Sequence, residues 1–302
     1  MKKALLMAIL ILVPLHLFAG FENEGKNGLS FLKIGINARA AGMGEAYTAV
    51  AADASATYWN PAGLVSAPFS NVLFHHNEWI EGIRGEFAAL SFVRKKSAWG
   101  LHVRSFNIGD IPVRIIPSEN PLEKTSAHYL SAGLSYARRL GSTLDVGATV
   151  KYLFEKIYVE SATGFALDVG IMYRSPFPNL RFGFVLQNLG KMNALFTEKS
   201  NLPQISRLGV LYDIPLNFRN IAARAAVDLV KPSQENVRLH LGAEFVLWKQ
   251  IALRGGFLEG YEAKNYSFGI GVLRSTVQFD YALTPFADDL GSTHRFSLNF
   301  AL

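Results

Sequence analysis

The chain contains no cysteine, and only 18% of its 302 residues are charged. Without thiols it can hold neither a disulfide framework nor a zinc–thiolate site. Half of the residues are apolar, which excludes a disordered chain because so much apolar surface has to be buried. A net charge of +6 on a chain of this length does not by itself indicate nucleic-acid binding.

Residues 1–19 have the pattern of a secretory signal peptide. Lys2 and Lys3 precede an apolar stretch that runs from Ala4 to Phe18, and Ala19 offers a small residue for cleavage. The stretch is too short to cross a membrane as a helix, and polar residues follow it at once. No cysteine follows it, which excludes a lipoprotein. We therefore expect an exported protein.

Beyond residue 69 the sequence alternates apolar and polar residues. In the stretch 142–157, Leu144, Val146 and Tyr152 fall on one face of an extended chain, and Asp145 and Lys151 fall on the other. Fourteen stretches show such alternation: 70–78, 86–94, 97–107, 126–139, 142–157, 163–174, 180–189, 204–213, 221–231, 237–248, 250–258, 265–273, 275–283 and 292–302.

The lengths of these stretches favour strands that cross a bilayer. Most have nine residues or more, and a tilted transmembrane strand needs about 9–11. Very short connections contrast with long ones such as Ile108–Thr125 and Gly190–Pro203. A secreted β-sandwich also alternates, but its strands are shorter and its outer face is polar. The sequence therefore predicts an all-β fold, with an about 14-stranded antiparallel transmembrane β-barrel over residues 70–302.

Residues 20–69 do not alternate and are rich in Ala and Gly, which suits a compact N-terminal plug inside the barrel. Two runs stand out, Ala38-Arg-Ala-Ala-Gly-Met-Gly-Glu-Ala-Tyr47 and Asp53-Ala-Ser-Ala-Thr-Tyr-Trp-Asn-Pro-Ala-Gly-Leu64. Together they resemble the N-terminal motif of the PorV/PorQ-like outer-membrane proteins, which are relatives of the FadL-type barrels. The stretch from Leu186 to Gly190, Leu-Gln-Asn-Leu-Gly, resembles a second motif of that family. Glu45 departs from the family pattern, which has Gly there.

The resemblance implies a fourteen-stranded barrel in the bacterial outer membrane with a small N-terminal plug. The candidates for the plug or its gate are Arg39, Gly42, Gly44, Asp53, Trp59, Asn60, Pro61 and Ala62. The charged candidates on the lumen face include Asp145, Lys151, Asp168, Arg224, Glu244 and Asp280. The full lumen set, six acidic against five basic residues, is close to balance. Such balance favours bracing ion pairs over an ion-selective pore.

No catalytic motif, metal site or cofactor site is expected. His75 and His76 are adjacent on a strand and point to opposite faces, so they cannot chelate one ion together. Gly42-x-Gly44 lacks the third Gly of a dinucleotide loop, because Tyr47 stands in its place. We expect neither an enzyme nor a nucleic-acid-binding protein.

Three functions are compatible with these patterns. In the first, implied by the resemblance, the barrel docks exported proteins with a C-terminal signal domain, or other components of type IX secretion, and Ile108–Thr125 is the candidate contact loop. In the second, a FadL-like barrel admits a hydrophobic ligand past the plug and releases it sideways. Phe69, Phe74 and Trp79 then line its path, although anchoring in the aromatic belt of the membrane explains these residues equally well. The third is a structural barrel without transport. Outer-membrane lipid surrounds the protein in all three.

Overall fold

The structure, a computed structural model, describes residues 28–114, 117, 120–195, 198–199, 201–216, 218 and 220–302. The expected signal peptide and the first residues of the segment 20–69 lie outside the described residues. Within the described ranges, no helix is both long enough and apolar enough to cross a membrane.

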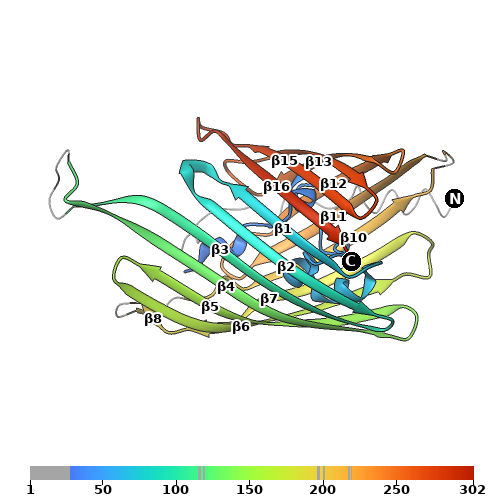
Figure 1. Cartoon of the computed structure of the whole chain (residues 1–302), viewed down its shortest axis with the longest axis horizontal. Helices are drawn as coiled ribbons and strands as arrows, with labels where there is room; N and C mark the ends of the chain where they lie inside the picture. The colour runs from blue at the N-terminus through green and yellow to red at the C-terminus, as the bar shows by residue number, and fades with distance from the viewer. Residues whose placement is uncertain are drawn as a thin grey trace.

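Fourteen antiparallel strands form a closed barrel, as the sequence predicted (Figure 1). They are β1 (Asn71–Glu78), β2 (Arg84–Arg94), β3 (Ser97–Val113), β4 (Glu123–Leu140), β5 (Leu144–Ile157), β6 (Glu160–Arg174), β7 (Leu180–Met192), β10 (Ile205–Ile214), β11 (Ile221–Pro232), β12 (Arg238–Leu247), β13 (Ile251–Glu259), β14 (Tyr266–Arg274), β15 (Val277–Pro285) and β16 (Ser292–Ala301). β1 closes the barrel against β16, from Asn71↔Ala301 to Glu78↔His294. All but one of the strand ends fall within three residues of the predicted stretches.

Burial along the strands is inverted relative to a soluble protein. On β5, Asp145 and Thr149 are fully buried, whereas Val150 is 56% exposed. On β6, Asp168 is fully buried while Phe165 is 64% exposed. The polar face therefore looks into the lumen and the apolar face looks outward, as lipid requires.

The two rims of the barrel differ. Tight turns such as 141–143, 248–250 and 275–276 lie at one end, the short-turn rim. The other end, the long-loop rim, carries the longest connections, 114–122 and 193–204, together with one tight turn, 158–159. In the connection from β7 to β10, β8 (Ala194–Leu195) and β9 (Glu198–Lys199) form a separate two-stranded sheet. Outer-membrane barrels place short turns in the periplasm and long loops outside the cell.

The expected long loop Ile108–Thr125 is largely wrong. β3 continues to Val113 and β4 begins at Glu123, so the strands pair beyond the wall as a hairpin that projects from the long-loop rim (Figure 1). The register shifts between Ile108 and Ile111. β2 stops pairing with β3 at Asn107, so the edge of β3 that faces away from β4 has no strand partner beyond that residue. An unpaired strand edge tolerates a proline such as Pro112, which has no backbone N–H to donate.

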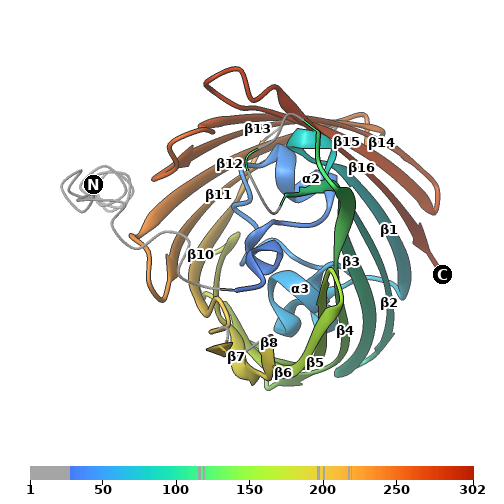
Figure 2. The ribbon, with the colours of Figure 1, turned by 90° about the vertical axis from the view of Figure 1, so that its left-hand side faces the viewer.

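The N-terminal segment lies inside the barrel (Figure 2). It consists of η1 (Ser30–Lys33), α2 (Ala38–Gly42), α3 (Ala56–Trp59) and η2 (Pro61–Ser66). α2 contacts β13 to β16, and η2 contacts β2 to β6, so the segment crosses the lumen from one wall to the other. Between Ile36 and Val65 every residue except Arg39 and Ala52 is buried. A further short helix, η3 (Ile80–Gly82), lies in the β1–β2 loop.

Candidate functional site: the plugged lumen

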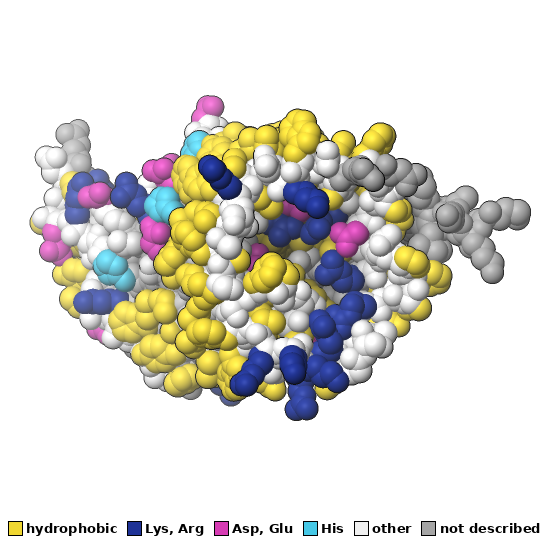
Figure 3. Space-filling view, turned by 45° about the vertical axis from the view of Figure 1, so that its right-hand side comes forward, with side chains coloured by type: hydrophobic (Ala, Val, Ile, Leu, Met, Phe, Trp, Pro, Cys, Tyr) yellow, Lys and Arg dark blue, Asp and Glu magenta, His cyan; other side chains and the backbone are white. Residues whose placement is uncertain are grey.

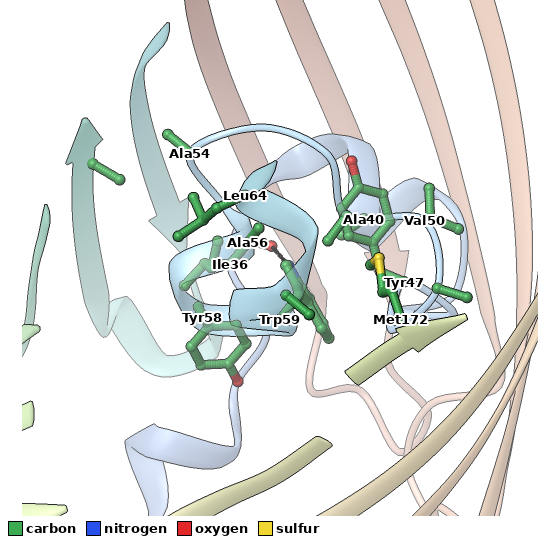
Figure 4. Close-up of a cluster of buried hydrophobic side chains, with 14 of the residues drawn as sticks. Ile36, Ala40, Tyr47, Val50, Ala54, Ala56, Tyr58, Trp59, Leu64 and Met172 are labelled. Carbon is green, nitrogen blue, oxygen red and sulfur yellow. Dashed lines mark hydrogen bonds between the residues drawn. The ribbon is translucent and has the colours of Figure 1, made fainter. Parts of the chain in front are cut away.

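The plug has an apolar core around Trp59, to which wall residues such as Met172 and Leu211 contribute (Figure 4). The Trp59 ring is fully buried, packs edge-on against Tyr58 at 5.0 Å between centroids, and donates from Nε1 to the Ile36 carbonyl at 3.1 Å. Tyr47 packs on the other side of the same ring at 5.8 Å. Trp59 thus holds three turns of the plug together, although a role in gating remains a prediction.

Glycines let the plug backbone touch the wall. Gly44 has a φ of +61°, and a Cβ there would lie 2.6 Å from the Leu241 carbonyl oxygen. Only Gly meets both conditions without strain. Gly42 lies against Gly269 of β14 in the same way. The Gly and Ala content that suggested a plug therefore reflects close backbone contact on both sides.

The Asn60-Pro61-Ala62 turn is tied to the wall by the Asn60 side chain. Its Nδ2 donates to the Thr48 carbonyl at 3.0 Å and to the Ile171 carbonyl of β6 at 3.1 Å, and its Oδ1 accepts from the Ala62 amide at 3.2 Å. The opposing wall residue is Gly170, where any Cβ would collide with the Asn60 Oδ1. Asn60 also caps η2, and Pro61 occupies its first turn.

Glu244 is the centre of an ion-pair network at one wall. Arg39 of α2 donates from Nε and Nη2 to its two carboxylate oxygens, both at 2.8 Å. Arg254 of β13 donates to Glu244 at 2.6 Å and to Asp280 at 2.8 Å, and Arg224 lies 3.4 Å from Glu244. The structure therefore joins four predicted site residues, and it adds Arg254. Arg254 could have been found from the sequence, because the alternation of faces along the predicted strand 250–258 places it on the lumen face.

Two more predicted carboxylates brace the opposite wall. Asp145 accepts from Arg139 at 2.9 Å, from Arg174 at 2.5 Å and from the plug hydroxyl of Ser66 at 2.8 Å. Asp168 lies 2.7 Å from the Lys151 ammonium and accepts a hydrogen bond from the backbone N–H of Asn188 at 2.7 Å. Asn188 belongs to the Leu186–Gly190 motif, and its Nδ2 donates to the Pro203 carbonyl at 2.8 Å.

Asp228 and Asp53 hold the plug backbone. Asp228 of β11, fully buried, accepts from the amides of Tyr47 and Thr48 at 3.0 and 2.9 Å and from the Thr48 hydroxyl at 2.6 Å. Asp53 acts within the plug, where it accepts the Ser55 amide at 2.8 Å ahead of α3. Asp53 therefore orders a turn, and Asp228 ties the plug to the wall.

The contacts of Glu45 explain why this residue stands where the family motif has Gly. It has a left-handed φ of 59°, where Gly is the favoured residue. Its carboxylate lies 2.9 Å from Arg295 of β16 and 3.9 Å from Lys264 in the β13–β14 loop. Burial alone would raise the pKa of Glu45, but Lys264 and Arg295 outweigh it and hold that pKa well below its usual range. The ion pairs offset the backbone strain.

Cations and aromatic rings alternate at the long-loop rim above Glu45. Lys264 Nζ lies 4.4 Å from the centroid of Tyr261 and 5.7 Å from that of Trp79, and Arg295 lies 5.2 Å from Trp79. Burial lowers the pKa of Lys264 to about 8, although Glu45 opposes this effect. No sequence pattern points to Lys264, because it lies in a loop where the alternation of apolar and polar residues carries no information.

The expected greasy path along Phe69, Phe74 and Trp79 is wrong. Phe69 and Phe74 are 60% and 50% exposed and face outward, and Trp79 lies at the long-loop rim. Phe74 instead helps to line a shallow apolar pocket of about 330 Å³ on the wall, with Phe279, Phe296 and Leu298. The alternation of the strand places Phe74 on the lipid side.

His75 and His76 point to opposite faces, as expected. His75 is buried and bonds the Phe296 carbonyl through Nδ1 at 3.0 Å, whereas His76 lies outward, 2.6 Å from Glu86. In the described part of the chain, no cluster of His, Asp and Glu side chains is arranged to hold a metal ion.

Comparison with known proteins gives a family and a fold. The model of the family "Type IX secretion system protein PorV" matches residues 23–232. A UPF0164 protein of Treponema pallidum (strain Nichols) is 28% identical over 170 residues, which cover 50% of this chain and 41% of that protein. The chain therefore matches less than half the length of this relative.

Two solved structures share the fold. The CymD monoaromatic hydrocarbon channel has a TM-score of 0.64 at 12% identity, over 89% of this chain and 98% of that one. The TodX monoaromatic hydrocarbon channel deltaS2 mutant has a TM-score of 0.58 at 12% identity, over 88% and 97%. At such identities the likeness is one of fold. Because the family match runs from residue 23 to the end of β11, over most of the 302 residues, this outer-membrane barrel belongs to the PorV family.

Proposed function

We propose that the protein is a docking component of type IX protein secretion, which receives exported proteins through their C-terminal signal domain at the long-loop rim. The family match supports this function. The observation that carries it is the plug, which crosses the lumen and is bound to both walls through Glu244, Asp228 and Asp145. A barrel held closed in this way acts through its rims and outer wall.

The β3–β4 hairpin is the proposed contact surface for cargo or partner proteins. It extends beyond the wall by several paired residues, from Ile111↔Thr125 to Val113↔Glu123. Its free edge beyond Asn107 offers unpaired backbone groups to an incoming strand. Glu123 and Lys124 are exposed on it, so the surface is polar.

The test is a deletion strain complemented with a shortened hairpin. Replacing residues 109–126 by Asn-Gly joins the Ile108↔Ala127 pair through a two-residue turn that suits a hairpin. A control variant keeps both strands and exchanges only 114–122 for a Gly/Ser segment of equal length. Heat-modifiable mobility on gels verifies that each barrel has folded.

We expect the shortened variant to reach the outer membrane but to leave C-terminal-signal proteins unexported, while the control restores at least part of the export. In-cell cross-linking from the hairpin should recover such proteins or secretion components. Normal export of every such substrate in the deletion strain itself contradicts the proposal.

Uptake of a hydrophobic small molecule is the second candidate. The fold shared with the monoaromatic hydrocarbon channels CymD and TodX and the apolar wall pocket beside Phe74 favour it. Against it, each of the fourteen strands pairs with its neighbours around the closed barrel. This function predicts an aromatic or lipid compound that co-purifies with the protein, and repeated ligand-free preparations count against it.

A further inference from the structure

The exposed acidic residues gather at one rim of the barrel, whereas exposed basic residues occur at both. At the short-turn rim six exposed basic residues occur: Arg94, Lys95, Lys96, Arg138, Lys249 and Arg274. The nine exposed acidic residues of the described chain all lie toward the long-loop rim: Glu78, Glu81, Glu86, Asp110, Glu123, Glu160, Glu262, Asp288 and Asp289. Figure 3 shows Lys and Arg side chains gathered at the lower right, on the side of the short turns, and most Asp and Glu side chains to the left.

The positive charge continues into the mouth of the barrel at this end. Arg139 and Arg174 share the buried carboxylate of Asp145, and their side chains are 30% and 28% exposed. Arg181 and Arg224, each 27% exposed, share Asp213. The guanidinium groups thus outnumber these carboxylates two to one. The cationic surface therefore covers the end of the barrel and is not confined to a ring facing lipid.

Two of the turn lysines occupy backbone positions that disfavour them. Lys95 has a φ of 45° and Lys249 a φ of 58°, in tight turns where Gly or Asn is the usual choice. Gly would relieve the strain and would remove the charge. Both turns nevertheless present an ammonium group at the tip.

We propose that the short-turn end of the barrel is a docking surface for an acidic segment of a periplasmic protein. Charge complementarity selects the partner, because this end combines six exposed cations with one partly exposed carboxylate, Asp213, among the described residues. A protein segment can reach both the turn tips and the mouth arginines. Phospholipid headgroups, which surround the wall, reach only the basic residues on the outside of the turns and not the arginines in the mouth. This inference depends on the orientation of the barrel and not on its role in secretion.

The test measures binding of fluorescent poly-L-glutamate to the whole protein in nanodiscs of zwitterionic lipid, by anisotropy at several salt concentrations. Lys95→Gly/Lys249→Gly removes two charges and relieves two strained turns, so the variant should fold at least as well as the parent. Lys156→Ala/Lys191→Ala removes two exposed lysines at the opposite rim and is the matched control.

We expect poly-L-glutamate to bind with an affinity that falls as salt rises. The glycine variant should bind roughly 2- to 30-fold more weakly, taking each exposed pair at its usual strength, and the control should bind like the parent. Equal losses in the two variants overturn the proposal. It is also overturned if poly-L-glutamate does not bind while native mass spectrometry shows phosphatidylglycerol retained by the parent and lost from the glycine variant.

Discussion

Replacing Arg39 by Gln tests how firmly the plug is bound to the wall. The substitution removes two charge-assisted hydrogen bonds to Glu244, each of 2.8 Å, and leaves that carboxylate paired with Arg254 at 2.6 Å. Breaking a buried ion pair costs about 3–5 kcal/mol when the other partner is left alone. Because Glu244 keeps a partner, we expect the plug to lose about 2–3 kcal/mol, just below that range.

Hydrogen exchange read by mass spectrometry measures this loss. If α2 opens locally, the amides of residues 38–48 should exchange roughly 30- to 150-fold faster, the factor that corresponds to about 2–3 kcal/mol. The strands of the wall should exchange as in the parent. Recordings in planar bilayers should show brief conducting events that the parent lacks.

Arg181→Gln is the control, because it removes the same charge from a pair between two wall strands, Arg181–Asp213 at 3.1 Å. It should leave exchange in the plug unchanged. If Arg39→Gln folds and residues 38–48 exchange at the parental rate, the Glu244 pair does not hold the plug, and the argument from its geometry is refuted.

Three further predictions concern the plug and its rim. Gly170→Ala should lower the free energy of unfolding by about 1–3 kcal/mol through overpacking, whereas Gly255→Ala, with open space around it, should change it little; urea unfolding in lipid vesicles measures both. By the same measurement Asn60→Ala, which leaves buried backbone groups without partners, should cost about 2–3 kcal/mol, and the exposed Asn201→Ala should be neutral. Burial lowers the pKa of Lys264 from 10.5 to about 8, so the folded state loses this proton first; stability should therefore rise from about pH 8 to about 10.5, and Lys264→Met should flatten that rise. A rise that persists in the variant would assign the effect to another group.

The strands were predictable because a barrel wall obeys local rules. Each side chain faces either lipid or lumen, so polarity alternates residue by residue, and Val150 and Lys151 reveal their faces without any knowledge of their neighbours. The rule fails beyond the wall. Both faces of the β3–β4 hairpin meet water, alternation fades there, and the sequence indicated a loop where the strands continue to Val113.

The position of the plug in the chain could be predicted from the sequence, but its contacts with the wall could not. Its Ala, Gly and Asn-Pro pattern identified a compact segment, yet the Arg39–Glu244 pair joins residues 205 positions apart, and no local pattern encodes such a contact. Glu45 is a second example of a plug residue whose partner in the wall cannot be predicted from the sequence. Its presence in place of Gly is visible in the sequence, but its partner Arg295 emerges only when the barrel closes around the plug.

The unequal strands give the barrel a tall side and a low side. β13, β14 and β15 have nine residues each, whereas β3 and β4 have 17 and 18. At about 3.3 Å per residue and a tilt of about 40°, nine residues span roughly 23 Å, close to the apolar band of about 25 Å. The tall side exceeds that band by roughly 20 Å. A partner that touches both the hairpin and the wall must therefore approach from the β3–β4 side. Within the plane of the membrane, one direction of approach is thus distinguished from all others.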